Sequence, residues 1–155
     1  MWYLREIQGP RGPSLLRMKK IEHLGIAVKD LKTANERYTQ LFGEPPYKQE
    51  GVESEGVMTS FFKSGPNKIE LLEGTREDSP IRKFIEKRGE GIHHVAFAVD
   101  DILAEVKRLK EEGFHILNET PKKGADNKWV VFVHPKDTHG VLWELCQEID
   151  GPLKG

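Results

Sequence analysis

The chain has 155 residues, of which 37% are hydrophobic and 32% charged, and its formal net charge is −1. Because 24 basic residues balance 25 acidic ones, no basic excess favours nucleic acid as a partner, and no long block of like charge favours an unfolded tail. No apolar run approaches the roughly 18 residues that a membrane helix needs. The single cysteine, Cys146, excludes an internal disulfide framework and fits a reducing compartment, so we expect a cytoplasmic protein.

The N-terminal segment mixes charged residues with Gly and Pro and has no continuous apolar stretch, which is not typical of a signal peptide. We expect residues 1–18 to form an irregular leader. The length that remains suits one compact domain over residues 19–148, followed by a short tail over residues 149–155.

The first half of this domain begins with an alternating aliphatic stretch, residues 22–28, that predicts a strand. Asp30 then offers an N-cap for a helix that ends at Gly43. Residues 43–51 predict a turn, and residues 56–74 predict two strands joined by a Ser-Gly-Pro-Asn turn. A Ser-Pro start at residues 79–80 predicts a short linking helix over residues 79–90.

The second half repeats this order. The predicted elements are a strand at 92–99, a helix at 100–113 capped by Gly113, a strand at 114–119, a loop at 120–128, and strands at 129–135 and 141–147 separated by a turn at 136–140. Each half is therefore predicted to be a βαβββ module, the first over about 20–74 and the second over about 91–148. The fold class is α+β.

The repeat aligns residue by residue at its two ends. "KIEHLGIAVKDL" (20–31) matches "GIHHVAFAVDDI" (91–102) without a gap, which pairs His23 with His94. "KIELLE" (68–73) matches "LWELCQ" (142–147), which pairs Glu70 with Glu144. Each half thus supplies one histidine from its first strand and one glutamate from its last strand.

Strand parity indicates which way these side chains point. Alternate residues of a strand share a face, so His94 faces the same way as Ala96 and Ala98, and His23 the same way as two other small residues. Small neighbours leave space beside the imidazoles, as a pocket wall requires and a packed core avoids. His93 falls on the opposite, aliphatic face of its strand, and we assign it no chemistry.

The two glutamates lie between large apolar residues, where a carboxylate is rarely buried unless it is paired or binds a metal. Taken alone, each histidine is more simply explained as a hydrogen-bonded strand residue, and each glutamate as a solvated one. Their recurrence at equivalent positions of two repeats favours a shared metal site. Two imidazoles and two carboxylates suit a divalent ion such as Co²⁺, Mn²⁺, Ni²⁺, Fe²⁺ or Zn²⁺.

The paired modules with His and Glu at these positions resemble the vicinal oxygen chelate superfamily, which includes glyoxalase I, extradiol dioxygenases and bleomycin-resistance proteins. Within it, the sequence is most similar to the methylmalonyl-CoA epimerase family. The stretches that carry the similarity are "IEHLGIAVKDL", "IELLEG", "SPIRKFIEKRGEGIHHVAFAVDDI" and "HPKDTHGVLWELCQ". The resemblance implies a glyoxalase-like fold in which both modules form one curved mixed sheet around a metal site.

The resemblance further implies a metal, most often Co²⁺, held by His23, Glu70, His94 and Glu144. It implies a homodimer that interconverts (2R)- and (2S)-methylmalonyl-CoA by removing and returning the C2 proton through a metal-chelated enolate. Some family members carry a glutamate, proposed as one of two bases, at the position that is Thr59 here. We therefore expect Glu144 to act as one base and Glu70, as ligand and base, to act as the other.

Coenzyme A carries phosphates, so cations are expected at the mouth of the pocket. Lys122, Lys123 and Lys136 are the candidates, although each is equally well explained as a solvated loop lysine. Two other functions remain open: a glyoxalase I-type reaction on a glutathione hemithioacetal, and a binding protein that sequesters a small molecule without catalysis.

Overall fold

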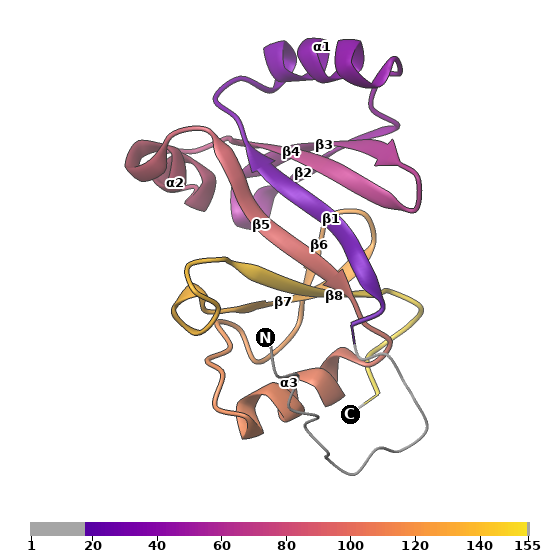
Figure 1. Cartoon of the computed structure of the whole chain (residues 1–155), viewed down its shortest axis with the longest axis vertical. Helices are drawn as coiled ribbons and strands as arrows, with labels where there is room; N and C mark the ends of the chain where they lie inside the picture. Colours follow the sequence, from indigo (N-terminus) through magenta and orange to yellow (C-terminus); the bar gives the residue numbers. More distant parts are fainter. Residues whose placement is uncertain (1–17, 155) are drawn as a thin grey trace, which may run out of the picture.

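The described part of the computed structural model, residues 18–154, is built around one eight-stranded mixed sheet with the strand order β2-β3-β4-β1-β5-β8-β7-β6 (Figure 1). The predicted leader therefore lies outside the described residues except for Met18. None of the described helices is both long enough and apolar enough to span a membrane.

The first module occupies one half of the sheet. Its elements are β1 (Lys20–Ala27), α1 (Leu31–Phe42), β2 (Lys48–Val52), the 3₁₀ turn η1 (Glu53–Glu55), β3 (Val57–Ser64) and β4 (Asn67–Gly74). Strands β2, β3 and β4 pair antiparallel, and β4 pairs in parallel with β1. α1 begins at Asp30, whose carboxylate accepts hydrogen bonds from the amides of Lys32 and Thr33, and ends at Gly43 with its φ of 74°.

The second module repeats this arrangement. Its elements are β5 (Gly91–Ala98), α3 (Ile102–Glu111), β6 (Lys122–Gly124), β7 (Lys128–Val133), the 3₁₀ turn η2 (Pro135–Asp137) and β8 (Trp143–Glu148). β6, β7 and β8 pair antiparallel, and β8 pairs in parallel with β5. The linking helix α2 (Pro80–Arg88) starts at the Ser79 N-cap, as its sequence predicts.

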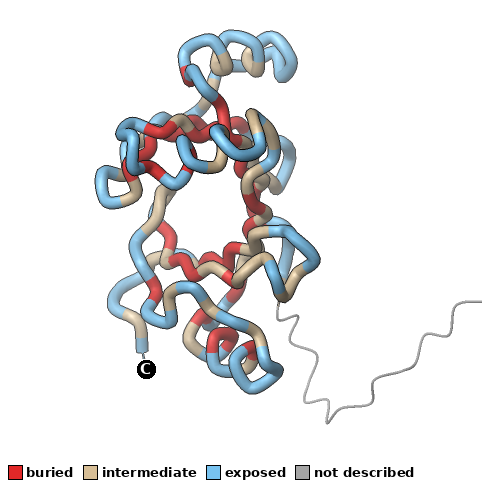
Figure 2. The backbone as a smooth tube through the Cα atoms, turned by 90° about the vertical axis from the view of Figure 1, so that its left-hand side faces the viewer, coloured by how far each residue is buried: buried red, intermediate tan, exposed pale blue. Residues whose placement is uncertain are grey.

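The two modules meet at the antiparallel pair β1–β5 in the middle of the sheet (Figure 1). Apolar residues on the outer face of each half pack under a helix. Val28, Leu31, Phe62 and Leu71 form the core below α1, and a larger cluster that includes Ile102, Val106, Val131 and Leu145 forms the core below α3. Figure 2 shows both helices outside a curved trace of buried strands, so the inner face of the sheet is left for the four polar residues of the repeat.

The order of strands and helices confirms the predicted α+β class and the paired βαβββ modules, but two short strands were misplaced. Residues 43–51 were expected to be only a turn, whereas β2 begins at Lys48; its residues alternate between partly buried and exposed because it is an edge strand. Residues 114–119 were expected to be a strand, but only Ile116 forms an isolated bridge, and the edge strand is β6, three residues later. The predicted helix cap Gly113 follows the observed C-cap, Glu112.

The two edges of the curved sheet are joined by charged side chains rather than by strand pairing. Asp126, in the β6–β7 turn, lies 2.7 Å from Lys68 Nζ on β4 and 3.4 Å from Lys48 Nζ on β2. Its backbone amide donates to the Glu50 carboxylate at 3.0 Å. Lys68 also lies 2.6 Å from Glu22, which is buried. The second module therefore closes against the first through this network, which we call the Asp126 network.

Candidate metal centre

Four side chains from four neighbouring strands meet on the inner face of the sheet. The order β4-β1-β5-β8 places Glu70, His23, His94 and Glu144 side by side. His23 Nε2 and His94 Nε2 are 3.1 Å apart, and Glu70 Oε1 lies 3.5 and 3.4 Å from them. Glu144 Oε2 lies 3.1 Å from His23 Nε2 and 4.0 Å from His94 Nε2. The two halves of the repeat thus bring their equivalent residues to one point.

All four side chains are buried, and the strand pairing leaves room for them. Gly25 on β1 lies opposite His94 on β5. A Cβ atom at Gly25 would lie 2.1 Å from His94 Cε1 and 2.4 Å from its Nδ1. The space that parity predicted beside His23 is therefore filled by the other imidazole, and Gly25 is required for that close approach.

The donor set fits a divalent cation. Ligand atoms of His23, His94 and Glu144 lie within 4.8 Å of one another, as they would around one ion. Glu144 Oε2 is buried and lies 3.1 Å from His23 Nε2. A buried carboxylate oxygen costs free energy unless a cation, such as a protonated imidazole or a metal ion, lies beside it. Imidazole nitrogens and carboxylate oxygens together suit borderline divalent metals.

The negative charges of the cluster also favour a bound cation. Burial by itself lowers the pKa of His23, but the negative charges of Glu144 and Glu70 outweigh it and raise this pKa to about 9. Burial raises the pKa of Glu144, yet the positive charge of His23 keeps it below its ordinary value. Without a metal, the carboxylates therefore hold a proton on His23, and a divalent cation would take its place.

His93, to which parity assigned no chemistry, contacts the centre directly. The register between β1 and β5 shifts at this point: Gly25 pairs with His94, Ile26 pairs with Ile92, and His93 is left over in a β-bulge. A bulge changes the direction of its side chain. His93 Nδ1 lies 2.9 Å from His94 Nδ1, on the side of the ring away from the centre. Burial, together with the charge of His94, lowers the pKa of His93 to about 4.

A hollow of about 320 Å³ opens over the cluster, and Glu70, His94 and Glu144 form part of its wall. Its volume is in the range of ligand sites. Lys122 and Lys123 of β6 line it, whereas Lys136 is exposed on η2 and does not. Thr59 also lines it.

Glu55 is a carboxylate in the same wall that the sequence analysis missed. It lies in the 3₁₀ turn η1, 3.8 Å from Lys122 Nζ. Residues 52–55 fall between the turn predicted at 43–51 and the strands predicted over 56–74, and an acidic side chain there gives no signal of its own.

Comparison with known proteins agrees with this site. Residues 22–132 match the family model described as the Glyoxalase/Bleomycin resistance protein/Dioxygenase superfamily. The ethylmalonyl-CoA/methylmalonyl-CoA epimerase of Cereibacter sphaeroides is 42% identical over 130 residues, which cover 83% of this chain and 97% of that protein. The chain belongs to the methylmalonyl-CoA epimerase family of this superfamily.

Further members of the family match over most of their length. The mitochondrial methylmalonyl-CoA epimerase of Homo sapiens is 38% identical over 135 residues, which cover 86% of this chain and 77% of that protein. The structure of a Streptomyces coelicolor methylmalonyl-CoA epimerase in complex with 2-nitronate-propionyl-CoA has a TM-score of 0.82 and 36% identity, and covers 87% of this chain and 99% of that one. The resemblance and the glyoxalase-like fold predicted from the sequence are thus confirmed.

Proposed function

We propose that this protein interconverts the 2R and 2S epimers of methylmalonyl-CoA at the cluster of His23, His94, Glu70 and Glu144. One observation supports this most strongly: the chain belongs to a family of epimerases, and its two repeats bring these four side chains together, with Glu70, His94 and Glu144 in the wall of a ligand-sized hollow. Relatives named methylmalonyl-CoA epimerase have been solved with methylmalonyl-CoA and with a nitronate analogue.

The four residues are proposed to hold a divalent metal ion, with Co²⁺ favoured and Mn²⁺, Ni²⁺ or Zn²⁺ as alternatives. Such an ion, when bound, would supply Lewis acidity to the substrate's oxygen atoms and offset the charge of its carboxylate. The buried Glu144 carboxylate and the pair of facing Nε2 atoms support this assignment.

Glu144 and Glu70 are proposed as the two bases. The low pKa of Glu144 keeps it ionised at neutral pH, so it can take the C2 proton, and the electron pair of the broken C–H bond moves toward the thioester carbonyl. A proton returned to the other face of C2 gives the second epimer. Glu70 and Glu144 come from strands on opposite sides of the β1–β5 pair, which supports their acting on opposite faces.

The hollow also supports binding of an acyl thioester. Its wall combines apolar side chains, such as Leu72, Val130 and Phe132, with the few polar groups described above. Lys122 and Lys123 are proposed to contact the acyl-CoA from β6. Lys136 receives no such support, because it does not line the hollow.

The proposal is tested by following the C2 proton of methylmalonyl-CoA by NMR in D₂O. Rapid deuterium incorporation, lost with EDTA and restored by Co²⁺, is the expected result. Absence of incorporation with every divalent ion would contradict the proposal, and turnover of methylglyoxal with glutathione would favour the glyoxalase I-type reaction instead.

The same assay separates the candidate bases. Glu144→Gln should abolish exchange, and wild-type exchange in this variant would remove Glu144 from the mechanism. Glu70→Gln and Glu55→Gln, compared at saturating metal, should show whether the second base is on β4 or in η1. We expect the larger loss from Glu70→Gln.

A homodimer and a cytoplasmic location are further proposals. The first follows from the family resemblance alone, and sedimentation or light scattering tests it. The second is supported by the lone Cys146, which is buried and whose thiol pKa is raised by that burial, so that it is an unreactive thiol.

A further inference from the structure

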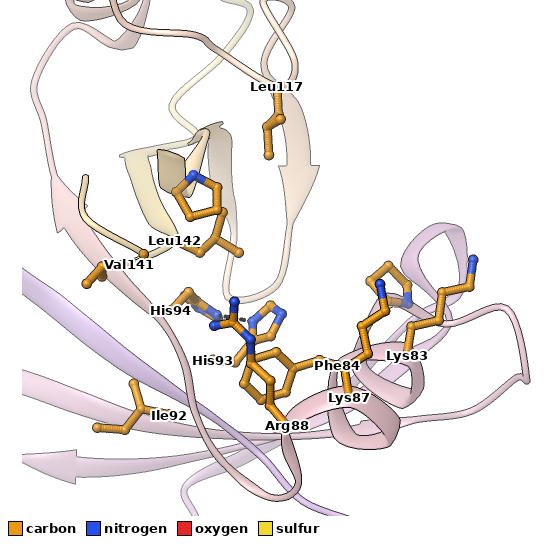
Figure 3. Close-up of a pocket in the computed structure, with 13 residues that line it drawn as sticks. Lys83, Phe84, Lys87, Arg88, Ile92, His93, His94, Leu117, Val141 and Leu142 are labelled. Atoms are coloured by element: carbon orange, nitrogen blue, oxygen red, sulfur yellow. Dashed lines mark hydrogen bonds between the residues drawn. The ribbon is translucent and has the colours of Figure 1, made fainter. Parts of the chain in front are cut away.

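A second hollow, of about 410 Å³, adjoins the first along helix α2 (Figure 3). The two hollows share the wall residues Pro80, His93, His94, Leu117 and Leu142. A ligand that reaches the metal centre can therefore extend past the histidines and along α2.

Three cations of α2 line this second hollow: Lys83, Lys87 and Arg88. All three are exposed, and none lies within 4.0 Å of a carboxylate in the described part of the chain. Figure 3 shows Lys83 and Lys87 extending from α2 toward the same side. Basic residues in a last helical turn stabilise the helix dipole, which accounts for Lys87 and Arg88. It does not account for Lys83, near the start of a helix whose first turn has no acidic residue.

Arg88 is linked to the metal centre by a row of ring contacts. Its guanidinium carbon lies 5.9 Å from the centre of the Phe84 ring. Phe84 meets His93 edge-on with 4.9 Å between ring centres, and His93 contacts His94. Figure 3 shows Arg88 running past Phe84 toward the two histidines. Among the three cations of α2, Arg88 is thus linked to the metal centre through Phe84 and His93.

Apolar side chains on the opposite wall are unusually exposed. Ile92 is 61% exposed, Leu117 is 55% exposed and Val141 is 41% exposed, and all three line this hollow. Exposed apolar groups gathered at one place mark a binding surface. Beside cations that make no ion pair within 4.0 Å among the described residues, they suit a ligand with an apolar or amide-bearing arm and an anionic end.

We propose that α2 binds the phosphates of the acyl-CoA substrate through Lys83, Lys87 and Arg88, with the pantetheine arm against Ile92, Leu117 and Val141. This inference rests on the proposed function. Phosphate oxygens accept charge-assisted hydrogen bonds from lysine and, in pairs, from arginine. The rival site on β6 is less open to phosphate, since Lys122 faces Glu55 and Lys123 Nζ lies over the Trp129 ring at 5.6 Å.

Charge reversal tests the assignment. The KM for methylmalonyl-CoA is compared with that for the methylmalonyl thioester of pantetheine, which lacks the phosphates. In the double variant Lys83→Glu/Lys87→Glu, the KM for methylmalonyl-CoA divided by the KM for the pantetheine thioester should rise by about 10- to 100-fold. The double variant Lys122→Glu/Lys123→Glu tests the alternative site on β6, and we expect it to raise this KM ratio by less. Lys32→Glu/Lys107→Glu, on the exposed faces of α1 and α3, is the control and should leave the ratio unchanged.

Each result decides the question. The proposal would be overturned if the β6 double variant raised the KM ratio more than the α2 double variant does. It would also be overturned if the α2 variant altered only the oligomeric state, because this face would then be a contact between copies of the chain. If charge reversal disrupts folding, Lys83→Gln/Lys87→Gln should still raise the ratio, by less. Binding of CoA itself can be measured by calorimetry without turnover. If the protein does not epimerise methylmalonyl-CoA but charge reversal on α2 still weakens CoA binding, the proposed function is contradicted and this phosphate site is supported.

Discussion

Replacing Gly25 by alanine should disable the metal centre while leaving the fold in place. The added Cβ would lie 2.1, 2.4 and 2.6 Å from three atoms of the His94 ring. Ordinary carbon contacts are about 3.5 Å or longer, so the ring would have to retreat by roughly 1.4 Å or more. Because His94 packs against His93 and Phe132, its ring can retreat only toward the hollows that it lines, and this movement takes its Nε2 away from the centre.

The expected loss is largest in metal affinity. Disturbing a residue that orients a ligand costs about 10- to 100-fold in affinity, and displacing the ligand itself should cost at least that much. Overpacking a buried site destabilises the fold by only about 1–3 kcal/mol. The φ of Gly25 lies outside the left-handed region, so its backbone adds no conformational penalty.

Calorimetric titration of the metal-free protein with Co²⁺ measures the first effect, and urea unfolding measures the second. Gly51→Ala is the matched control, because its Cβ would meet only the flexible end of Met58, at 3.4 Å. If Gly25→Ala binds Co²⁺ with wild-type affinity, the imidazole of His94 is not a ligand in the position described here.

Four further predictions concern charge. Binding of Co²⁺ near neutral pH should release about one proton, because the charges of Glu144 and Glu70 outweigh burial and raise the pKa of His23 to about 9. Calorimetry in buffers of different ionisation enthalpy measures the number of protons released. A value of zero would contradict the prediction. In the metal-free protein, the stability contributed by protonated His23 is complete below about pH 6.5 and is lost as the pH rises through 9. Burial and the charge of His94 lower the pKa of His93 to about 4, so the free energy of unfolding should fall as the pH drops from 6.5 toward 4. In urea unfolding, His93→Gln should make this pH dependence weaker. An unchanged pH dependence would show that other groups cause it. Asp126→Ala should lower the free energy of unfolding by about 1–3 kcal/mol and speed amide exchange in the β6–β7 turn. Asp78→Ala, which breaks an exposed pair with Arg76, is the control and should have a much smaller effect. Equal effects would mean that the Asp126 network does not hold the turn.

The internal repeat explains why so much of the candidate site could be predicted from the sequence. Residues at equivalent positions of two modules meet when the modules pair through their equivalent strands, here β1 and β5. The alignment of His23 with His94 and of Glu70 with Glu144 therefore carried three-dimensional information. Two helices were predicted for a local reason, since Asp30 and Ser79 cap them within the sequence itself.

What the sequence did not reveal depends on partners far along the chain. β2 and β6 are short edge strands whose polar residues carry little periodic signal, and only pairing with β3 and β7 makes them strands. In the Asp126 network, the contacts of Asp126 itself reach residues 58 or more positions away along the chain. His93 was assigned to the wrong face because strict alternation fails at a bulge, and the bulge arises from the register with β1.

The two bulges of the β1–β5 pair suggest why the molecule has a closed end and an open one. Glu22 is left over in β1 just as His93 is in β5, and the two positions are equivalent in the repeat. Each bulge turns an ionisable side chain toward the interior, but at opposite ends of the pair. Glu22 meets Lys68 and, through it, the Asp126 network, which closes that end. His93 meets Phe84 and the hollow along α2. The same backbone irregularity therefore closes the sheet at one end, and at the other end it lies beside the hollow of α2, where we propose that the acyl-CoA binds.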